Sequence, residues 1–275
     1  GINMKKRLLD KVVVITGPSS GIGLATAQEL AKRGCKVYNI SRSGLAPEDV
    51  CKKNYQCDVN QVEEIDRILN EIFSIEGKID VVVNNAGFGI AGAIDNASVE
   101  NVYKLIDTNL SSLICISGRA IKFLKKSGGG KIINISSVGG LIPLPYQATY
   151  SATKAGVEIF SRALANEVKQ FGIKVCAILP GDTKTNFTQA RVIENDNKDN
   201  SETASIIKSI KKVEKDEQTG KSPQSVAKVI CKVIKKRNPP LRKTVGLSYK
   251  CVTLLAKLMP IRLINWIVRL LYVKK

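Results

Sequence analysis

The sequence predicts a doubly wound α/β protein, with a parallel sheet of about seven strands and helices on both faces. Short β-branched runs alternate with longer amphipathic segments over most of the 275 residues, which is enough chain to bury a large core. Glycine and small polar residues follow the predicted strands, where the ligands of such sheets bind. We expect one domain over residues 4–246 and a helical extension over residues 247–275.

Each element is predicted from the spacing of its apolar residues. Strands are expected where β-branched residues occur together, and helices where apolar residues recur every third or fourth position. Gly34 stands where the first helix should stop. The predicted strands are residues 11–15, 36–40, 55–59, 79–83, 131–135, 173–179 and 241–245, and the predicted helices are 22–32, 61–75, 99–126 (two pieces joined near Asp107) and 150–170.

Residues 186–220 differ from this pattern because they are polar and charged, with an acidic and amide-rich stretch at 194–200. A run of this length inside a compact domain is usually a functional segment, so we predict a lid. Gly1, Ile2 and Asn3 precede Met4 and resemble residues left by cloning, so they are excluded from the fold.

The composition excludes several kinds of chemistry. The chain contains no histidine, so Ser-His-Asp and Cys-His sites and histidine-ligated metal centres are impossible, and no metal site is predicted. The seven cysteines are scattered and form no C-x-x-C pair. Most lie in apolar runs, as Cys115 and Cys176 do, so we expect reduced, buried thiols in a cytoplasmic protein without a secretory signal.

A glycine-rich turn, Thr-Gly-Pro-Ser-Ser-Gly-Ile-Gly at residues 16–23, joins the first predicted strand to the first helix. Glycine lets the backbone turn tightly and approach a pyrophosphate, while the helix N-terminus supplies N–H donors. This strand–turn–helix context is typical of a Rossmann dinucleotide site. From this turn we predict the cofactor-binding residues Gly17, Ser19, Ser20, Gly21, Ile22 and Gly23.

The residues after the second strand indicate which dinucleotide binds. Ser41 and Arg42 stand where an acidic residue would bind the ribose 2′-hydroxyl of NAD, and no Asp or Glu occurs until Glu48. A guanidinium suits a 2′-phosphate, so NADP(H) is expected in preference to NAD(H), although a solvated surface arginine is the alternative. Further cofactor residues are expected at the ends of the third and fourth strands, where turn chemistry alone also favours Asn and Gly; these are Asp58, Val59, Asn85, Ala86 and Gly87.

A serine, a tyrosine and a lysine follow the fifth predicted strand at a recognisable spacing. Ser137 lies just past that strand, and Tyr150 comes thirteen residues later, in Tyr150-Ser-Ala-Thr-Lys154. Tyr150 and Lys154 are four residues apart and so share one helix face. With the glycine-rich turn, Asn109 in Asp-Thr-Asn-Leu and Pro180-Gly181, this pattern resembles the classical short-chain dehydrogenase/reductase family from about residue 11 to residue 185.

The resemblance implies an oxidoreductase that reduces a ketone or aldehyde to an alcohol, reversibly. It makes Tyr150 the general acid or base, with Lys154 lowering the tyrosine pKa and binding the nicotinamide ribose. Ser137 would hydrogen-bond the carbonyl or alkoxide oxygen, and Ser136 is its neighbouring alternative. Asn109 would hold a water that relays protons to Lys154. Pro180, Gly181 and Thr185 would complete the cofactor site, with Thr185 at the nicotinamide carboxamide.

The C-terminal extension is basic and apolar. Of the 43 Lys and Arg residues, 14 lie in 221–275 together with no Asp or Glu, which leaves 29 basic against 24 acidic residues elsewhere. Arg262, Asn265 and Arg269 fall on one helical stripe, and Pro260 divides the segment into two short helices. Such a segment suits an anionic membrane surface. Packing over the substrate pocket or across a dimer interface is the favoured alternative, because a protein surface buries two short helices more easily.

The sequence therefore predicts an NADP(H)-dependent reductase acting on a bulky hydrophobic carbonyl compound, such as a lipid, steroid-like or fatty-acyl ketone. The alternatives are a 3-oxoacyl reductase acting on an acidic carrier protein, and a dinucleotide-sensing protein without turnover. We expect a homodimer or homotetramer, with peripheral membrane contact through the extension as the open possibility. Nucleic-acid binding is not expected, because the extension offers one tryptophan and no known motif.

Overall fold

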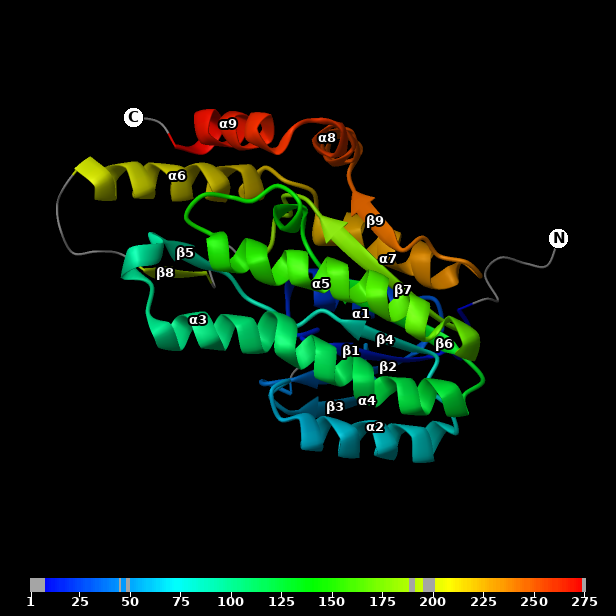
Figure 1. The fold of residues 1–275 in the computed structure, drawn as a ribbon. Coiled ribbons are helices and arrows are strands. Elements are labelled where there is room, and N and C mark those ends of the chain that lie inside the picture. Colours follow the sequence, from blue (N-terminus) through cyan, green and yellow to red (C-terminus); the bar gives the residue numbers. More distant parts are fainter. Residues whose placement is uncertain (1–7, 45, 48–49, 188–190, 195–200, 274–275) are drawn as a thin grey trace.

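A computed structural model describes residues 8–273 except 45, 48–49, 188–190 and 195–200. Seven strands form one parallel sheet in the order β3-β2-β1-β4-β6-β7-β9, which confirms the predicted doubly wound fold (Figure 1). Residues 1–3, expected to come from cloning, lie outside the described part. The strands are β1 Val12–Thr16, β2 Lys36–Ser41, β3 Lys53–Gln56, β4 Val81–Asn84, β6 Gly130–Ile135, β7 Ile173–Pro180 and β9 Arg242–Val245.

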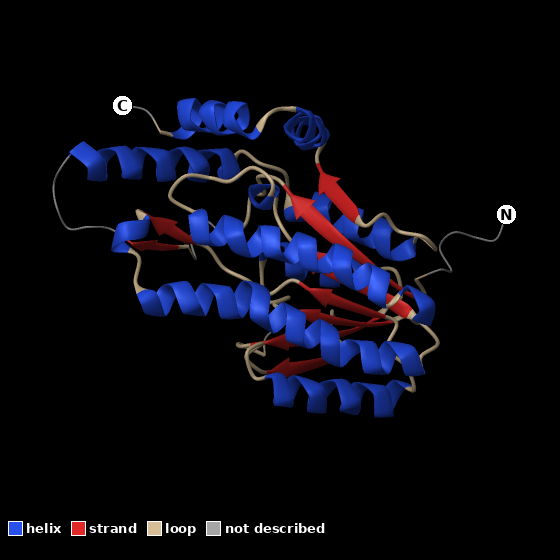
Figure 2. Cartoon of the chain, in the orientation of Figure 1, coloured by secondary structure: helices blue, strands red, loops and turns tan. Residues whose placement is uncertain are grey.

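Helices cover both faces of the sheet (Figure 2). On one face, α2 (Val62–Glu76), α4 (Ser112–Lys126) and α5 (Ala148–Glu167) pack on the side chains of Val12 and Val14. On the other face, α1 (Gly21–Ala31) and α7 (Pro223–Lys235) pack on Val13 and Ile15. Alternate residues of β1 are thus buried on opposite faces, which explains why the strand is an unbroken apolar run.

Several predicted boundaries shift. The third strand was predicted at residues 55–59, but β3 is Lys53–Gln56 because the backbone turns at Asp58, whose carboxylate accepts from Asn60 N at 2.9 Å. The predicted join near Asp107 is a π-helical turn, Asp107–Ser111, which connects α3 (Val99–Ile106) to α4 without a break. Helix α7 was not predicted, although Ser222 caps it and Pro223 begins it.

The predicted lid region has its own secondary structure. Strand β8 (Val192–Glu194) pairs with β5 (Ile90–Gly92) in a second, two-stranded sheet, and α6 spans Ser201–Gln218. Neither strand of this small sheet was predicted, because three-residue strands carry almost no hydrophobic period. Much of the acidic stretch at 194–200 lies outside the described residues.

Two helices form the C-terminal extension, α8 (Leu247–Leu258) and α9 (Ile261–Tyr272), with Pro260 between them as predicted. They lie beyond the β9 edge of the sheet, next to α6 (Figure 1). Lys212 Nζ of α6 donates to Leu271 O at 2.6 Å. No helix in the described part is both long and apolar enough to cross a membrane.

The burial of the cysteines differs in part from the prediction. All seven lie within the described ranges and are free thiols. Cys176, predicted to be buried, is buried, but Cys251 is exposed, and so is Cys115 although it lies in an apolar run. The Cys115 position on α4 faces solvent because the helix buries a different stripe, which includes Ile116, Ala120 and Phe123.

Candidate active site

A cavity of about 1190 Å³ runs from the glycine-rich turn, past Ser137 and Tyr150, to the inner faces of α8 and α9. All of the predicted cofactor-binding residues line it. They are Gly17, Ser19, Ser20, Gly21, Ile22, Gly23, Ser41, Arg42, Asp58, Val59, Asn85, Ala86, Gly87, Tyr150, Lys154, Pro180, Gly181 and Thr185.

The glycine-rich turn is held by the residues that follow β4. Gly17 has a φ of +65°, and a Cβ there would lie 3.0 Å from the Ala86 backbone. Thr16 Oγ1 accepts from Asn85 N at 3.0 Å and from Ala86 N at 3.1 Å. The Asn85 amide donates to Thr16 O and Gly17 O, so its side chain braces the turn.

The glycine-rich end of the cavity carries groups that suit a dinucleotide. Ser20 forms no side-chain cap on α1, and the first turn of that helix carries no acidic residue, so its N–H groups are open to an anion. Ser41 Oγ is buried and has no hydrogen-bond partner among the described residues, and Arg42 is exposed at the cavity wall. Within the described part of the chain Arg42 forms no ion pair, so its charge is available to a ligand.

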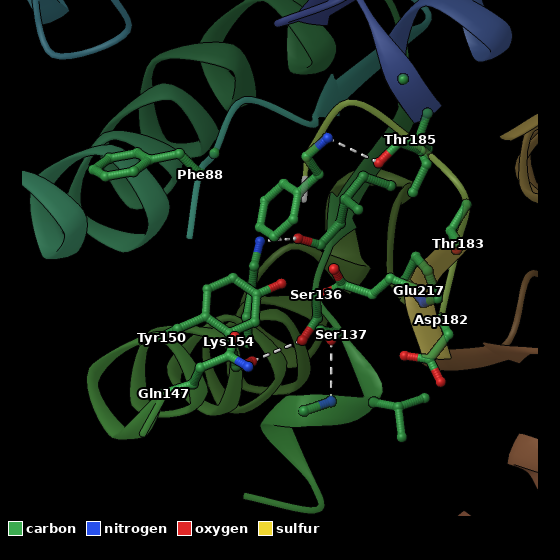
Figure 3. Close-up of a pocket in the computed structure, with 18 of the residues that line it drawn as sticks. Phe88, Ser136, Ser137, Gln147, Tyr150, Lys154, Asp182, Thr183, Thr185 and Glu217 are labelled. Carbon is green, nitrogen blue, oxygen red and sulfur yellow. Dashed lines mark hydrogen bonds between the residues drawn. The ribbon is translucent and has the colours of Figure 1, made fainter. Parts of the chain in front are cut away.

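Ser137, Tyr150 and Lys154 meet at the middle of the cavity (Figure 3). Ser137 precedes a single 3₁₀ turn, Val138–Gly140, and its hydroxyl accepts from Gly139 N at 3.0 Å and hydrogen-bonds Tyr150. Tyr150 and Lys154 lie on the first two turns of α5, where both side chains are buried. The neighbouring Ser136 hydroxyl donates to Lys154 O at 2.7 Å, which leaves Ser137 as the serine facing the tyrosine.

Burial is the main cause of the shifted pKa values of Tyr150 and Lys154. Burial raises the pKa of Tyr150 to about 12, although the hydrogen bond from Ser137 lowers it. Burial also lowers the pKa of Lys154 to about 8. The lysine Nζ donates to Ile135 O at 3.0 Å and lies 5.8 Å from the Tyr150 ring centroid. Burial is the largest cause of the raised tyrosine pKa, and the lowering expected from Lys154 stays a prediction.

Asn109 lies behind the cavity wall. It is in the π-helical turn and is fully buried, with its amide bonded to both backbone groups of Phe88 at 3.0 and 2.9 Å. A Cβ at Gly87 would lie 3.0 Å from Asn109 Oδ1 and 3.6 Å from Lys154 Nζ, so the two side chains flank the same glycine. The structure thus brings Asn109 near Lys154, and the water relay remains a prediction.

The lid region contributes residues that the sequence did not single out. The Phe187 ring lies 5.7 Å from the Tyr150 ring, and Phe187 N donates to Thr185 Oγ1 at 3.1 Å. The buried Arg191 side chain pairs with Glu217 of α6, and the Glu217 charge raises the pKa of Tyr150. Asp182 also lines the cavity and accepts from the Tyr249 hydroxyl. Asp182 directly follows Pro180-Gly181, but the sequence offered no reason to select it as a site residue.

The fold and this site define an oxidoreductase, and comparison with known proteins identifies its family. Residues 11–196 match the model of the short chain dehydrogenase family, and the chain belongs to that family.

Individual relatives differ in how much of the chain they match. The chain is 40% identical over 238 residues to a 3-ketodihydrosphingosine reductase from Bacteroides thetaiotaomicron, covering 86% of this chain and 88% of the relative. It is 35% identical over 186 residues to a 3-oxoacyl-[acyl-carrier-protein] reductase from Escherichia coli, covering 66% of this chain and 76% of the relative. Among solved structures, a short-chain dehydrogenase from Streptomyces avermitilis is 28% identical with a TM-score of 0.77, covering 89% of this chain and 92% of that one.

The two reductases differ in how much of this chain their alignments cover. An alignment over 86% of 275 residues cannot stay within 11–196, so the likeness to the 3-ketodihydrosphingosine reductase includes the α6 region. The carrier-protein reductase matches about the length of the family model alone.

Proposed function

We propose that this protein is an NADP(H)-dependent reductase of a ketone in a long-chain lipid, with a sphingoid ketone as the substrate class. The observation that carries the proposal is the continuity of the cavity. It joins Ser137 and Tyr150 to the apolar inner faces of α8 and α9 without an intervening wall.

The far end of the cavity suits an aliphatic chain. Its apolar lining comes from the extension, with Val213 of α6 and Phe187 beside it. Each buried methylene of a bound chain contributes about 0.8 kcal/mol, so a long chain gains much more than a short one. The residues from the extension are Val252, Leu255, Ala256, Met259, Ile264, Ile267, Val268, Leu271 and Tyr272.

The polar lining suits a substrate with a charged group near its carbonyl. A 3-ketosphingoid base has an amino group on the carbon next to the ketone. Asp182 and Glu217 both line the cavity, and the Glu217 charge acts on Tyr150 (Figure 3). Glu217 is already paired with Arg191, so Asp182 is the carboxylate that would stabilise an ammonium, since opposite charges attract strongly away from bulk water.

The catalytic side chains suit carbonyl reduction. A bound nicotinamide would supply the hydride. Ser137 is placed to hydrogen-bond the carbonyl oxygen, and Tyr150, protonated at neutral pH by its raised pKa, is placed to give that oxygen a proton. Lys154, with Asn109 behind it, would hold the ribose and return a proton to the tyrosine.

The choice of NADP(H) rests on Arg42 and the buried Ser41 hydroxyl at the adenosine end of the cavity. Cytoplasmic location and assembly as a homodimer or homotetramer belong to the same proposal. Light scattering on the purified protein would test the assembly.

The test is a panel of 3-ketones of increasing chain length, with and without a 2-amino group, assayed with NADPH and NADH. We expect kcat/KM to rise with chain length and with the amino group, and NADPH to be preferred. Strict dependence on acyl-carrier protein would support the 3-oxoacyl reductase instead, which the carrier-protein relatives and the basic extension favour. Tight dinucleotide binding without turnover of any ketone would indicate a sensor.

A further inference from the structure

Helices α8 and α9 have two apolar sides. Their inner faces line the cavity, and their outer face carries large apolar side chains that are mostly exposed in the described structure. We call this the outer face of the extension. Among its residues, Leu258 is 77% exposed and Trp266 is 57% exposed. Exposed apolar patches of this kind mark interaction surfaces. The outer face comprises Leu247, Leu254, Leu258, Trp266 and Leu270.

Positive charges lie among these apolar side chains. Lys250 and Lys257 of α8 and Arg262 and Arg269 of α9 are all exposed. No acidic residue occurs anywhere from residue 221 to the end of the chain. The outer face therefore combines apolar burial with a uniform positive charge, which complements an anionic lipid surface.

The charge argues against a second copy of the chain as the occupant. A twofold contact places the same patch on both subunits, so the four cations of one outer face would meet the same four on its partner. Because the extension has no carboxylate to pair with them, such a contact would bury repelling charges.

The same helices connect the outer face to the active site. Val252 and Leu255 of α8 and Leu271 of α9 line the cavity, yet each is also more than 40% exposed, so the cavity reaches the surface between these helices. We infer that the outer face of the extension docks on an anionic bilayer and that a lipid ketone enters the cavity from the membrane. The entry route rests on the proposed function, whereas the docking does not.

Trp266 provides a direct probe because it is the only tryptophan in the chain. The full-length protein is mixed at low salt with vesicles of phosphatidylcholine, with and without phosphatidylglycerol, and sedimented. We expect binding only to the anionic vesicles, with a blue shift of Trp266 emission and quenching by brominated acyl chains. High salt should release the protein.

A matched pair of variants tests where the contact lies. Lys257→Glu/Arg262→Glu reverses two charges of the outer face, and Lys228→Glu/Lys232→Glu makes the same charge change on exposed residues of α7. The first pair should weaken binding to anionic vesicles by at least about tenfold, and the second should have little effect. Protection against thermal unfolding by NADPH shows that each variant is folded.

Three results would overturn the docking. They are absence of binding to anionic vesicles at low salt, binding without a change in Trp266 emission, and equal loss in both pairs. Dimerisation that shifts Trp266 emission without lipid would assign the face to a second copy. None of these measurements depends on turnover. A failure of membrane docking therefore does not contradict the proposed function, and inactivity on every ketone does not contradict the docking.

Discussion

The two ends of the cavity are built differently. At the dinucleotide end, side chains are fixed by hydrogen bonds to backbone groups, as Asn85 is to Thr16 and Gly17 and Asn109 is to Phe88. Behind them, the Asn84 amide donates to Ser117 and Asn134 in a buried network. At the far end, α8 and α9 contribute apolar side chains, many of them partly exposed. The proposed catalytic residues thus lie on a frame fixed by hydrogen bonds, whereas the proposed substrate end is built from elements with few geometric constraints.

The largest effect should come from the rigid end. Tyr150→Phe removes the proton donor while the ring still packs on Phe187, so we expect turnover to fall by about 10²–10⁴-fold. Cofactor affinity and thermal stability should stay close to wild type. Steady-state kinetics measure the loss, and Tyr103→Phe, at a tyrosine 64% exposed outside the cavity, is the control. Turnover within tenfold of wild type would mean that another group donates the proton.

A smaller effect is expected where the dinucleotide end meets solvent. Arg42→Ala should weaken NADPH binding by about 10–150-fold, because a charge-assisted hydrogen bond is worth roughly 1.5–3 kcal/mol. NADH binding should hardly change, since it lacks the 2′-phosphate. Titration calorimetry with both cofactors measures the difference, and Arg119→Ala removes an exposed arginine that does not line the cavity. Equal losses for the two cofactors would assign Arg42 a structural role.

The burial of Lys154 makes stability depend on pH. Its pKa is lowered to about 8 in the folded protein, so between that pH and the unfolded pKa of 10.5 the unfolded state binds more protons. The cost of holding the ammonium in the core is therefore present below pH 8 and is relieved as the pH rises. Relative to Lys154→Met, the free energy of unfolding should rise by about 2 kcal/mol between roughly pH 7.5 and 10. Urea unfolding of both proteins at the two pH values measures the free energy of unfolding. If this free energy changes equally with pH in the two proteins, the lowered pKa of Lys154 is contradicted.

The smallest effect should come from the apolar end. Ile267→Val removes one methylene from the cavity wall, so kcat/KM for a long-chain ketone should fall about fourfold at most. A short ketone should be unaffected, because it does not reach α9. Val99→Ala, at a 68% exposed residue of α3, serves as the control. Equal changes for short and long ketones would show that the chain binds elsewhere.

The residues at the dinucleotide end of the cavity could be predicted from the sequence, because each motif there has a local physical cause. The β-branched runs predicted the strands of the main sheet, and the glycine-rich turn and the spacing of Ser137, Tyr150 and Lys154 predicted residues that the fold brings to one cavity. Burial of Tyr150, which raises its pKa, and burial of Lys154, which lowers its pKa, could not be inferred from spacing. It depends on how α5 packs against residues far away in sequence.

The far end could not be predicted in the same way. Phe187 and Arg191 precede β8, and Glu217 lies on α6. The three-residue pairing of β8 with β5 leaves no hydrophobic period that would have predicted these positions. The extension was expected either to pack over the pocket or to lie on a membrane. In the structure α8 and α9 cover the cavity with one side and expose the other, because both sides of each helix are apolar.

The contact between Gly181 and Tyr249 has an evolutionary consequence. A Cβ at residue 181 would lie 2.3 Å from the Tyr249 ring, so this tyrosine can occupy its place only opposite glycine. The two positions are thus epistatic: an alanine at 181 would be tolerated in a chain without α8 and harmful in this one. A lineage that carries this tyrosine on α8 would lose the freedom to change the residue that follows β7.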